Sequence, residues 1–89
     1  MNKATRFDAG EIVRLRRDRY ELKAGSCGIV WGVYDFVPVL YEATFVTESG
    51  EEADLMFEDQ DCDAVSDVRE APFPERLLEM QRVFESGER

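Results

Sequence analysis

The amino-acid sequence predicts a mainly β protein, a small five-stranded barrel followed by a C-terminal amphipathic α-helix. Three observations lead to this fold class. Over the first two thirds of the chain, apolar and polar residues alternate with a period of two, as they do along half-buried strands. Turn residues divide this part into five short segments about 8–12 residues apart, a spacing typical of small barrels. After Pro74 the apolar residues change to a helical period.

The composition describes one small globular domain. The 89 residues contain 11 Lys and Arg against 20 Asp and Glu, so the formal net charge is −9, and there is no histidine. This deficit of basic residues disfavours nucleic acid as a partner, because phosphate neutralisation requires Lys and Arg. No stretch approaches the roughly 18 apolar residues of a transmembrane helix, so we expect no membrane association. We divide the chain into an N-terminal arm (1–9), the barrel (10–70) and the helix (71–89).

The first two strands are expected at 11–18 and 27–36. In the first, valine and leucine alternate with arginines, which predicts one buried and one exposed face. One face of the second is expected to carry, in alternation, Cys27, Ile29, Trp31 and Val33. Gly28 and Gly32 share its other face, which indicates a bent strand or a close backbone neighbour.

Three further strands follow at 40–47, 52–58 and 64–69. A glycine-containing turn at Gly50 joins the first two of them as a hairpin. Residues 60–63 form a polar break with room for one 3₁₀ turn. The last strand is centred on two valines, so five strands complete the predicted barrel.

The C-terminal segment carries the signals of a helix of about three turns. Pro74 suits the first turn, Glu75 is favourable at a helix N-terminus, and Gly87 is a suitable terminator. The apolar residues of its main face are Leu77, Met80 and Phe84. A helix this short does not persist alone in water, so it must dock. It either closes one open end of the barrel or presents Met80 and Phe84 to a partner.

Two cysteines, Cys27 and Cys62, match neither a zinc site nor a redox pair by their spacing. We expect two reduced thiols, with Cys27 in the core and chemically inert. The alternative is one disulfide, which would stabilise a small secreted domain by about 2–4 kcal/mol. The first residues carry charges every few positions and lack the apolar segment of a secretory signal, which favours reduced thiols and a cytoplasmic protein.

Residues 25–30, Gly-Ser-Cys-Gly-Ile-Val, form a G-x-x-G-x-V turn into the second strand, and Tyr-Glu-Ala-Thr-Phe follows at 41–45 before the Gly50 hairpin. This order resembles the SH3-like barrels of the KOW and Tudor type and, more closely, a family of small bacterial proteins of unknown function with this barrel. The resemblance covers residues 10–70 and implies an SH3-like barrel. Ala43 stands where the family pattern often has valine. The family supplies no catalytic residues, and its apparent association with toxin-like or enzyme-like neighbours implies binding.

Charge is segregated along the chain. Residues 1–23 hold seven basic and four acidic side chains, whereas residues 42–70 hold eleven acidic side chains and one arginine. The basic first strand can lie beside the acidic late strands and offset their repulsion. Five acids match positions 1, 3, 5, 9 and 12 of a calcium loop: Asp59, Asp61, Asp63, Asp67 and Glu70. Ala64 stands where that loop requires glycine, so we expect no metal site.

We expect no enzyme and no cofactor, because the chain lacks imidazole and its carboxylates cluster in one run with no inferred pocket. The acidic surface and exposed aromatics instead predict a non-enzymatic acidic intracellular protein-binding module that engages a basic partner, such as an inhibitor, immunity protein or antitoxin. The candidate partner-binding residues are Tyr20, Tyr34, Phe36, Glu48, Glu51, Glu52, Asp54, Asp59 and Asp61.

Two other functions fit the same sequence. One is an accessory subunit or maturation factor of a metalloenzyme complex that makes its contact through the helix. The other is a KOW-like RNA-binding module that uses a stripe of arginines in and after the first strand, namely Arg14, Arg16, Arg17 and Arg19.

Overall fold

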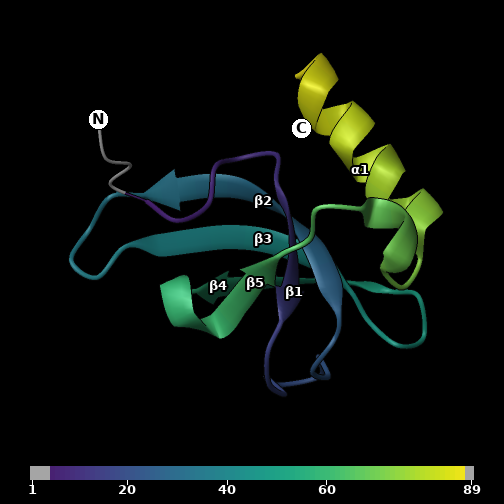
Figure 1. The fold of residues 1–89 in the computed structure, drawn as a ribbon, viewed down its shortest axis with the longest axis horizontal. Coiled ribbons are helices and arrows are strands. Elements are labelled where there is room, and N and C mark those ends of the chain that lie inside the picture. Colours follow the sequence, from purple (N-terminus) through teal and green to yellow (C-terminus); the bar gives the residue numbers. More distant parts are fainter. Residues whose placement is uncertain (1–4, 88–89) are drawn as a thin grey trace.

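The protein has five antiparallel strands in one sheet and a C-terminal helix (Figure 1). The structure, a computed structural model, describes residues 5–87. In chain order the elements are β1 (Ile12–Leu15), β2 (Cys27–Tyr34), β3 (Leu40–Val46), β4 (Glu52–Phe57), the 3₁₀ turn η1 (Asp59–Asp61), β5 (Cys62–Ala64), the 3₁₀ turn η2 (Val68–Glu70) and α1 (Pro74–Ser86). The mainly β class with a terminal helix is therefore confirmed.

The strand order across the sheet is β4-β3-β2-β1-β5. Strand β1 pairs with both β2 and β5, so β4 and β5 are the two edge strands. Within residues 5–87 no ladder joins β4 to β5, and the sheet is not closed. The structure thus confirms the five strands but does not confirm a closed barrel.

The main core fills one face of this curved sheet. It consists of Phe7, Val13, Leu15, Leu22, Val30, Tyr41, Ala43, Phe45, Leu55, Phe57 and Cys62. The ring of Phe7 packs edge-on against Tyr41 and Phe57, with centroids 5.2 and 6.1 Å away. Phe7 is fully buried although it belongs to the arm that precedes β1. One isolated apolar residue among charged neighbours has no periodicity, which is why the sequence pattern did not reveal it.

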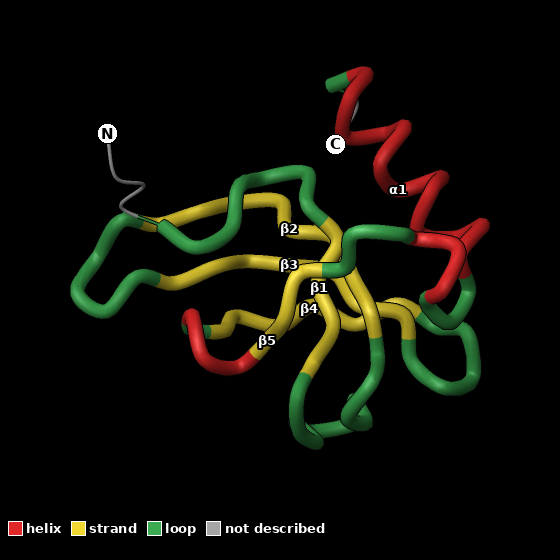
Figure 2. The backbone as a smooth tube through the Cα atoms, in the orientation of Figure 1, coloured by secondary structure: helices red, strands yellow, loops and turns green. Residues whose placement is uncertain are grey.

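Helix α1 packs against β2 and η2, on the side of the sheet opposite the main core (Figures 1 and 2). It begins at Pro74 and its last residue is Ser86. Gly87 caps it, because its left-handed backbone (φ 74°) lets its N–H donate to the carbonyl oxygens of Val83 and Phe84. This second apolar layer consists of Ile12, Cys27, Ile29, Val46, Ala71, Leu77 and Met80. Of the two placements left open, the structure shows docking on the helix's own chain. No helix between residues 5 and 87 is long and apolar enough to cross a membrane.

A β-bulge at Trp31 changes which side of β2 faces the main core. The register with β3 shifts between Val30 and Gly32, so Trp31 is an extra residue on the bulged strand. Before the bulge, Cys27 and Ile29 face the helix; after it, Val33 packs against the main core. The prediction that Val33 shares a face with Cys27 is therefore wrong, because a strict period of two does not survive an inserted residue.

The fifth strand lies earlier than predicted. It was expected at 64–69, but β5 ends at Ala64 and η2 follows. The side chain of Asp67 accepts a hydrogen bond from the backbone N–H of Arg69, which favours a turn there. Val65 and Val68 pack against the helix layer, so their apolar character reflects contact with α1 and not strand alternation.

Gly28 lies where β2 and β3 approach each other most closely. A Cβ atom at this position would overlap the carbonyl oxygen of Thr44 and the Cα atom of Phe45. Backbone atoms cannot rotate away as a side chain can. The expected close backbone neighbour is thus confirmed at Gly28, whereas Gly32 faces only the ends of flexible side chains.

We expect Gly28→Ala to lower the free energy of unfolding by about 1–3 kcal/mol, because the added methyl group must displace the backbone of β3. Gly32→Ala is the matched control in the same strand and should have a smaller effect. Urea unfolding followed by the fluorescence of Trp31 measures both. Equal stability of Gly28→Ala and the wild type would contradict the close approach.

Candidate protein-binding surface

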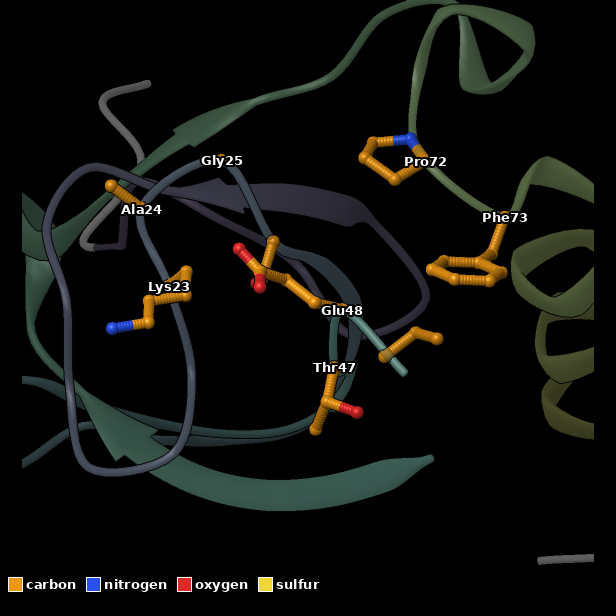
Figure 3. Close-up of a pocket in the computed structure, with 9 residues that line it drawn as sticks. Lys23, Ala24, Gly25, Thr47, Glu48, Pro72 and Phe73 are labelled. Carbon is orange, nitrogen blue, oxygen red and sulfur yellow. The ribbon is translucent and has the colours of Figure 1, made fainter. Parts of the chain in front are cut away.

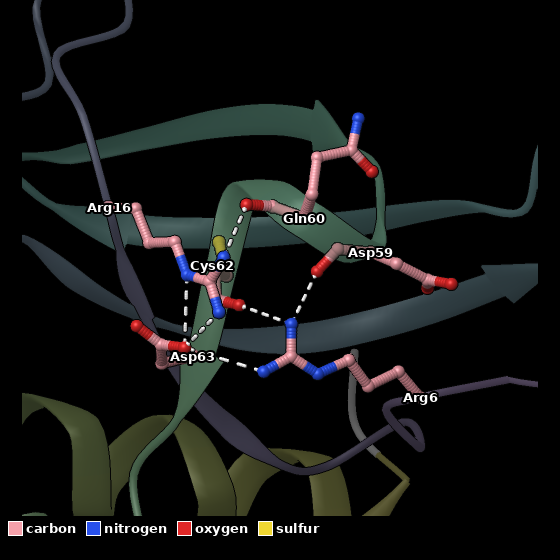
Figure 4. Close-up of polar contacts among 6 residues, drawn as sticks. All are labelled: Arg6, Arg16, Asp59, Gln60, Cys62 and Asp63. Carbon is pink, nitrogen blue, oxygen red and sulfur yellow. Dashed lines mark hydrogen bonds and ion pairs between the residues drawn. The ribbon is translucent and has the colours of Figure 1, made fainter.

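The acidic run divides into two parts in the structure. In the first part, around η1 and β5, the carboxylates bind arginines of the same chain (Figure 4). Asp63 Oδ1 accepts hydrogen bonds from Arg16 Nη2 (2.6 Å) and Nε (3.0 Å) and from Arg6 Nη2 (3.3 Å). Asp61 forms an ion pair with Arg19 at 3.4 Å. Arginines that precede and follow β1, and not residues of β1 itself, therefore offset the charge of these late acids.

The same arginines hold the backbone of η1 and β5. Arg6 Nη1 donates to the carbonyl oxygens of Asp59 (2.7 Å) and Cys62 (3.0 Å), and Arg16 Nη1 donates to that of Gln60 (3.2 Å). Exposed ion pairs alone add little stability. Bonds from two guanidinium groups to three backbone carbonyl oxygens fix the position of this segment. We define Arg6, Arg16 and Asp63 as the arginine clamp.

The first part of the run is a poor candidate for recognition or for calcium. Asp59 accepts a hydrogen bond from the Tyr41 hydroxyl, and Asp67 pairs with Arg69. Four of the five carboxylates of the calcium-like pattern thus bind other side chains of the protein, namely Asp59, Asp61, Asp63 and Asp67. In the described part of the chain, no three His, Cys, Asp or Glu side chains converge to hold a metal ion.

The second part of the run lies on the outward side of β3 and β4. Cross-strand pairs on this side join Glu42 to Met56, Thr44 to Asp54 and Val46 to Glu52. We call Glu42, Glu52 and Asp54 the outer acidic face. Glu42 accepts a hydrogen bond from the Tyr34 hydroxyl (3.0 Å), and Glu52 pairs with Arg76 (2.9 Å). Between residues 5 and 87, no basic side chain pairs with Asp54.

A groove of about 380 Å³ runs between this face and helix α1. Residues of β2, β3, β4 and α1 line it; we call the part from β2 and β3 its floor and the parts from β4 and α1 its walls. The lining residues are Trp31, Thr44, Glu52, Asp54, Glu79, Met80 and Val83. The groove thus combines an indole, two apolar side chains and three carboxylates that come from two different elements.

A chain of two hydrogen bonds sets the orientation of groups in this groove. The indole N–H of Trp31 donates to the hydroxyl of Thr44 (2.7 Å), and that hydroxyl donates to Asp54 Oδ1 (2.6 Å). Thr44 is only 5% exposed, so its hydroxyl has little competition from water. One buried hydroxyl therefore fixes both the Trp31 ring and the Asp54 carboxylate.

The predicted aromatic residues lie in two separate places. Tyr34, the last residue of β2, stacks on Phe36 with centroids 5.7 Å apart, and Phe36 is 59% exposed. Tyr20 is 84% exposed in the loop between β1 and β2, with the Arg19 guanidinium 5.9 Å from its ring centroid. Tyr20 adopts a left-handed backbone (φ 56°), which is uncommon for a bulky residue and suits a tight loop tip.

Glu48 and Glu51 lie in the hairpin between β3 and β4. Glu48 lines a smaller cleft of about 190 Å³ beside Lys23 and Phe73 (Figure 3). In this view Pro72 and Phe73 stand on one side of Glu48, and Lys23 and Ala24 stand on the other. Because the cleft offers one acid and one base, it has no charge preference comparable to that of the larger groove.

The structure does not gather the nine predicted binding residues into one site. Glu52 and Asp54 share the groove, and Tyr34 reaches the outer acidic face through Glu42. Asp59 and Asp61 belong to the first part of the run. The sequence pattern missed the groove residues Trp31, Thr44, Glu79 and Val83, and it named Met80 only in the alternative in which the helix presents it to a partner. Only the polar Thr44 inside an apolar strand and the acid at Glu79 beside the apolar helix face could have indicated them.

Neither cysteine has the environment of a nucleophile. Both are free and buried, Cys27 on the helix side of the sheet and Cys62 in the main core. Burial raises the pKa of the Cys27 thiol. Burial, together with the charges of Asp61 and Asp63, raises the pKa of Cys62 to about 12. Both thiols are therefore protonated and unreactive at neutral pH.

No protein-family model matches the chain, and no curated protein sequence matches it.

The arginine clamp makes stability depend on pH. Hydrogen bonds from Arg16, followed by the charges of Arg16 and Arg6, hold the pKa of Asp63 below its usual value. A carboxylate whose pKa is lowered by folding stabilises the protein above its unfolded-state pKa and loses that contribution as the pH falls through the folded value. For an aspartate this loss occurs below about pH 4.

We therefore expect Asp63→Asn to be less stable than the wild type at pH 7 and to lose less of its stability between pH 5 and pH 2. Urea unfolding at a series of pH values provides the measurement. Glu85→Gln, which removes an exposed helix carboxylate far from the clamp in sequence, should follow the wild-type pH profile. An identical pH profile for Asp63→Asn and the wild type would show that the clamp does not act.

Removal of the buried Thr44 hydroxyl should lower the stability of the protein. Thr44→Val keeps the shape of the side chain but leaves the Trp31 N–H without its acceptor, so we expect a loss of about 1–3 kcal/mol in the free energy of unfolding. Thr44→Ser keeps the hydroxyl and should lose less. Urea denaturation monitored by circular dichroism compares the two, and a Thr44→Val variant as stable as Thr44→Ser would contradict the hydrogen-bond chain.

Proposed function

We propose that this protein is a non-enzymatic binding module that engages a basic protein partner through its outer acidic face, as an inhibitor, immunity protein or antitoxin does. The single observation that carries the proposal is Asp54. It is exposed at a groove with two other carboxylates, and no arginine or lysine of the described chain pairs with it. Other acids of the run, Glu52 among them, bind the chain's own arginines, whereas Asp54 remains available to a foreign cation.

The proposal includes an SH3-like barrel as the scaffold. Its support is the strand order, in which β1 pairs on both sides and only the ladder between β4 and β5 is missing. It also includes a cytoplasmic location, for which two free buried thiols are the support, since reducing compartments keep thiols unpaired.

The two alternatives have less support from the contacts. Of the arginine stripe proposed for RNA, Arg16 and Arg19 already pair with Asp63 and Asp61. An accessory subunit that binds through the helix would need its apolar face, but Leu77 and Met80 are buried against the sheet. Electrostatic recognition by the outer acidic face is therefore the function that the geometry favours.

Affinity capture from a lysate of the source cells tests the proposal at low and high salt. The triple variant Glu42→Gln, Glu52→Gln and Asp54→Asn removes the charge of the face while each amide keeps an acceptor oxygen. The control, Glu70→Gln, Glu75→Gln and Glu85→Gln, removes equal charge elsewhere. We expect a basic protein that the wild type and the control retain at low salt, that high salt releases, and that the triple variant does not retain. Retention by the triple variant, or insensitivity to salt, would overturn the proposal.

A further inference from the structure

The groove between β4 and α1 has the lining of a site for a planar cation. We propose that it receives an arginine side chain of the basic protein partner. This inference rests on the proposed function, because it names the group by which that partner is recognised. Its support comes from the shape of the groove, from the position of its charges and from the fixed orientation of Trp31.

The shape suits a long side chain that ends in a charge. The groove of about 380 Å³ is bordered along α1 by the apolar side chains of Met80 and Val83. Such a wall accommodates the methylene stem of an arginine, which buries apolar surface while its head group stays with polar partners. The indole of Trp31 on the floor offers an aromatic surface to that head group.

Charges reach the groove from both walls. Glu52 and Asp54 come from β4, and Glu79 comes from α1. Glu52 and Glu79 already pair with Arg76 (2.9 Å) and Arg82 (2.5 Å). Glu52 and Glu79 therefore already bind guanidinium groups of the chain itself, whereas Asp54 binds none among the described residues. An incoming cation completes this set at Asp54.

Asp54 retains acceptor sites for such a cation. Thr44 donates one hydrogen bond to Oδ1, and a carboxylate has about four lone-pair positions on its two oxygens. A guanidinium group can therefore donate two parallel hydrogen bonds to it. Because the Thr44 hydroxyl also holds the Trp31 indole at 2.7 Å, the carboxylate and the ring are oriented before the partner arrives.

This combination favours arginine over lysine. A guanidinium group is planar, carries five donors, is weakly hydrated, and both stacks on aromatic rings and pairs with carboxylates in two-point contacts. An ammonium group is a compact, strongly hydrated charge that gains less from an oriented ring and a carboxylate. The neutral urea group of citrulline has the shape of arginine without its charge, so it separates shape from charge in a test.

The experiment follows the indole N–H resonance of Trp31, the chain's one tryptophan, in the ¹⁵N-labelled full-length protein. Capped Gly-Arg-Gly, Gly-Lys-Gly and Gly-citrulline-Gly peptides are the probes. We expect the arginine peptide to shift this resonance to saturation and the other two to bind at least about fivefold more weakly. Asp54→Asn should weaken the arginine peptide about tenfold or more, as expected for loss of a charge-assisted contact. Glu70→Gln is the control and should bind as the wild type does.

Three results would overturn the inference: no saturable shift with the arginine peptide, equal or tighter binding of the lysine or citrulline peptide, or unchanged binding by Asp54→Asn. The capture experiment separates this failure from failure of the proposed function. If high salt releases a basic protein that the triple variant does not retain, while the arginine peptide leaves Trp31 unmoved, the function stands and the arginine site is wrong. If salt has no effect on capture, the function itself fails.

Discussion

Strand β2 is buried on both of its faces, and this constraint determines how the rest of the chain is arranged. One face carries Val30 into the main core, and the other carries Cys27 and Ile29 into the layer under α1. A strand with two apolar faces must be covered on both of them. Helix α1 is therefore a necessary part of the fold, because it buries the second face of β2. Trp31 lies at the bulge of β2. Its indole packs at the edge of the helix layer and also lines the groove.

The contacts that hold helix α1 in place consequently lie next to the groove. The ring of Trp31 packs against Phe84 of α1 with centroids 5.9 Å apart, while its N–H is bonded to Thr44 of β3. Arg76 ties the first turn of the helix to Glu52 and to the carbonyl oxygen of Gly50. Side chains that hold α1 in place are therefore the neighbours of the side chains that line the groove.

Periodicity and turn chemistry were sufficient to predict the class, four of the five strands within a few residues, and the helix from Pro74 to Gly87. They failed where tertiary contact competes with local pattern. Val65 and Val68 resemble strand residues because α1 covers them, and Val33 leaves its predicted face because one residue is inserted before it. The acidic surface could be predicted as a composition. Its division could not, because the arginines that pair with Asp61 and Asp63 lie about 40 residues away in the sequence.

Phe7 makes the arm before β1 part of the main core, although the neighbouring residues of the arm are polar. Its ring is enclosed by Tyr41 and Phe57, and nearby Gly10 accepts a hydrogen bond at its carbonyl oxygen from Gln81 of the helix. The segment before β1 and helix α1 thus contact each other in the folded protein, although Phe7 lies in the main core and α1 packs on the other side of the sheet. A shortened version that starts at β1 would leave a cavity in the main core where the Phe7 ring lies. It would also lose the hydrogen bond between Gln81 of the helix and Gly10. The smallest unit able to fold on its own therefore includes the arm, and expression boundaries should be drawn ahead of it.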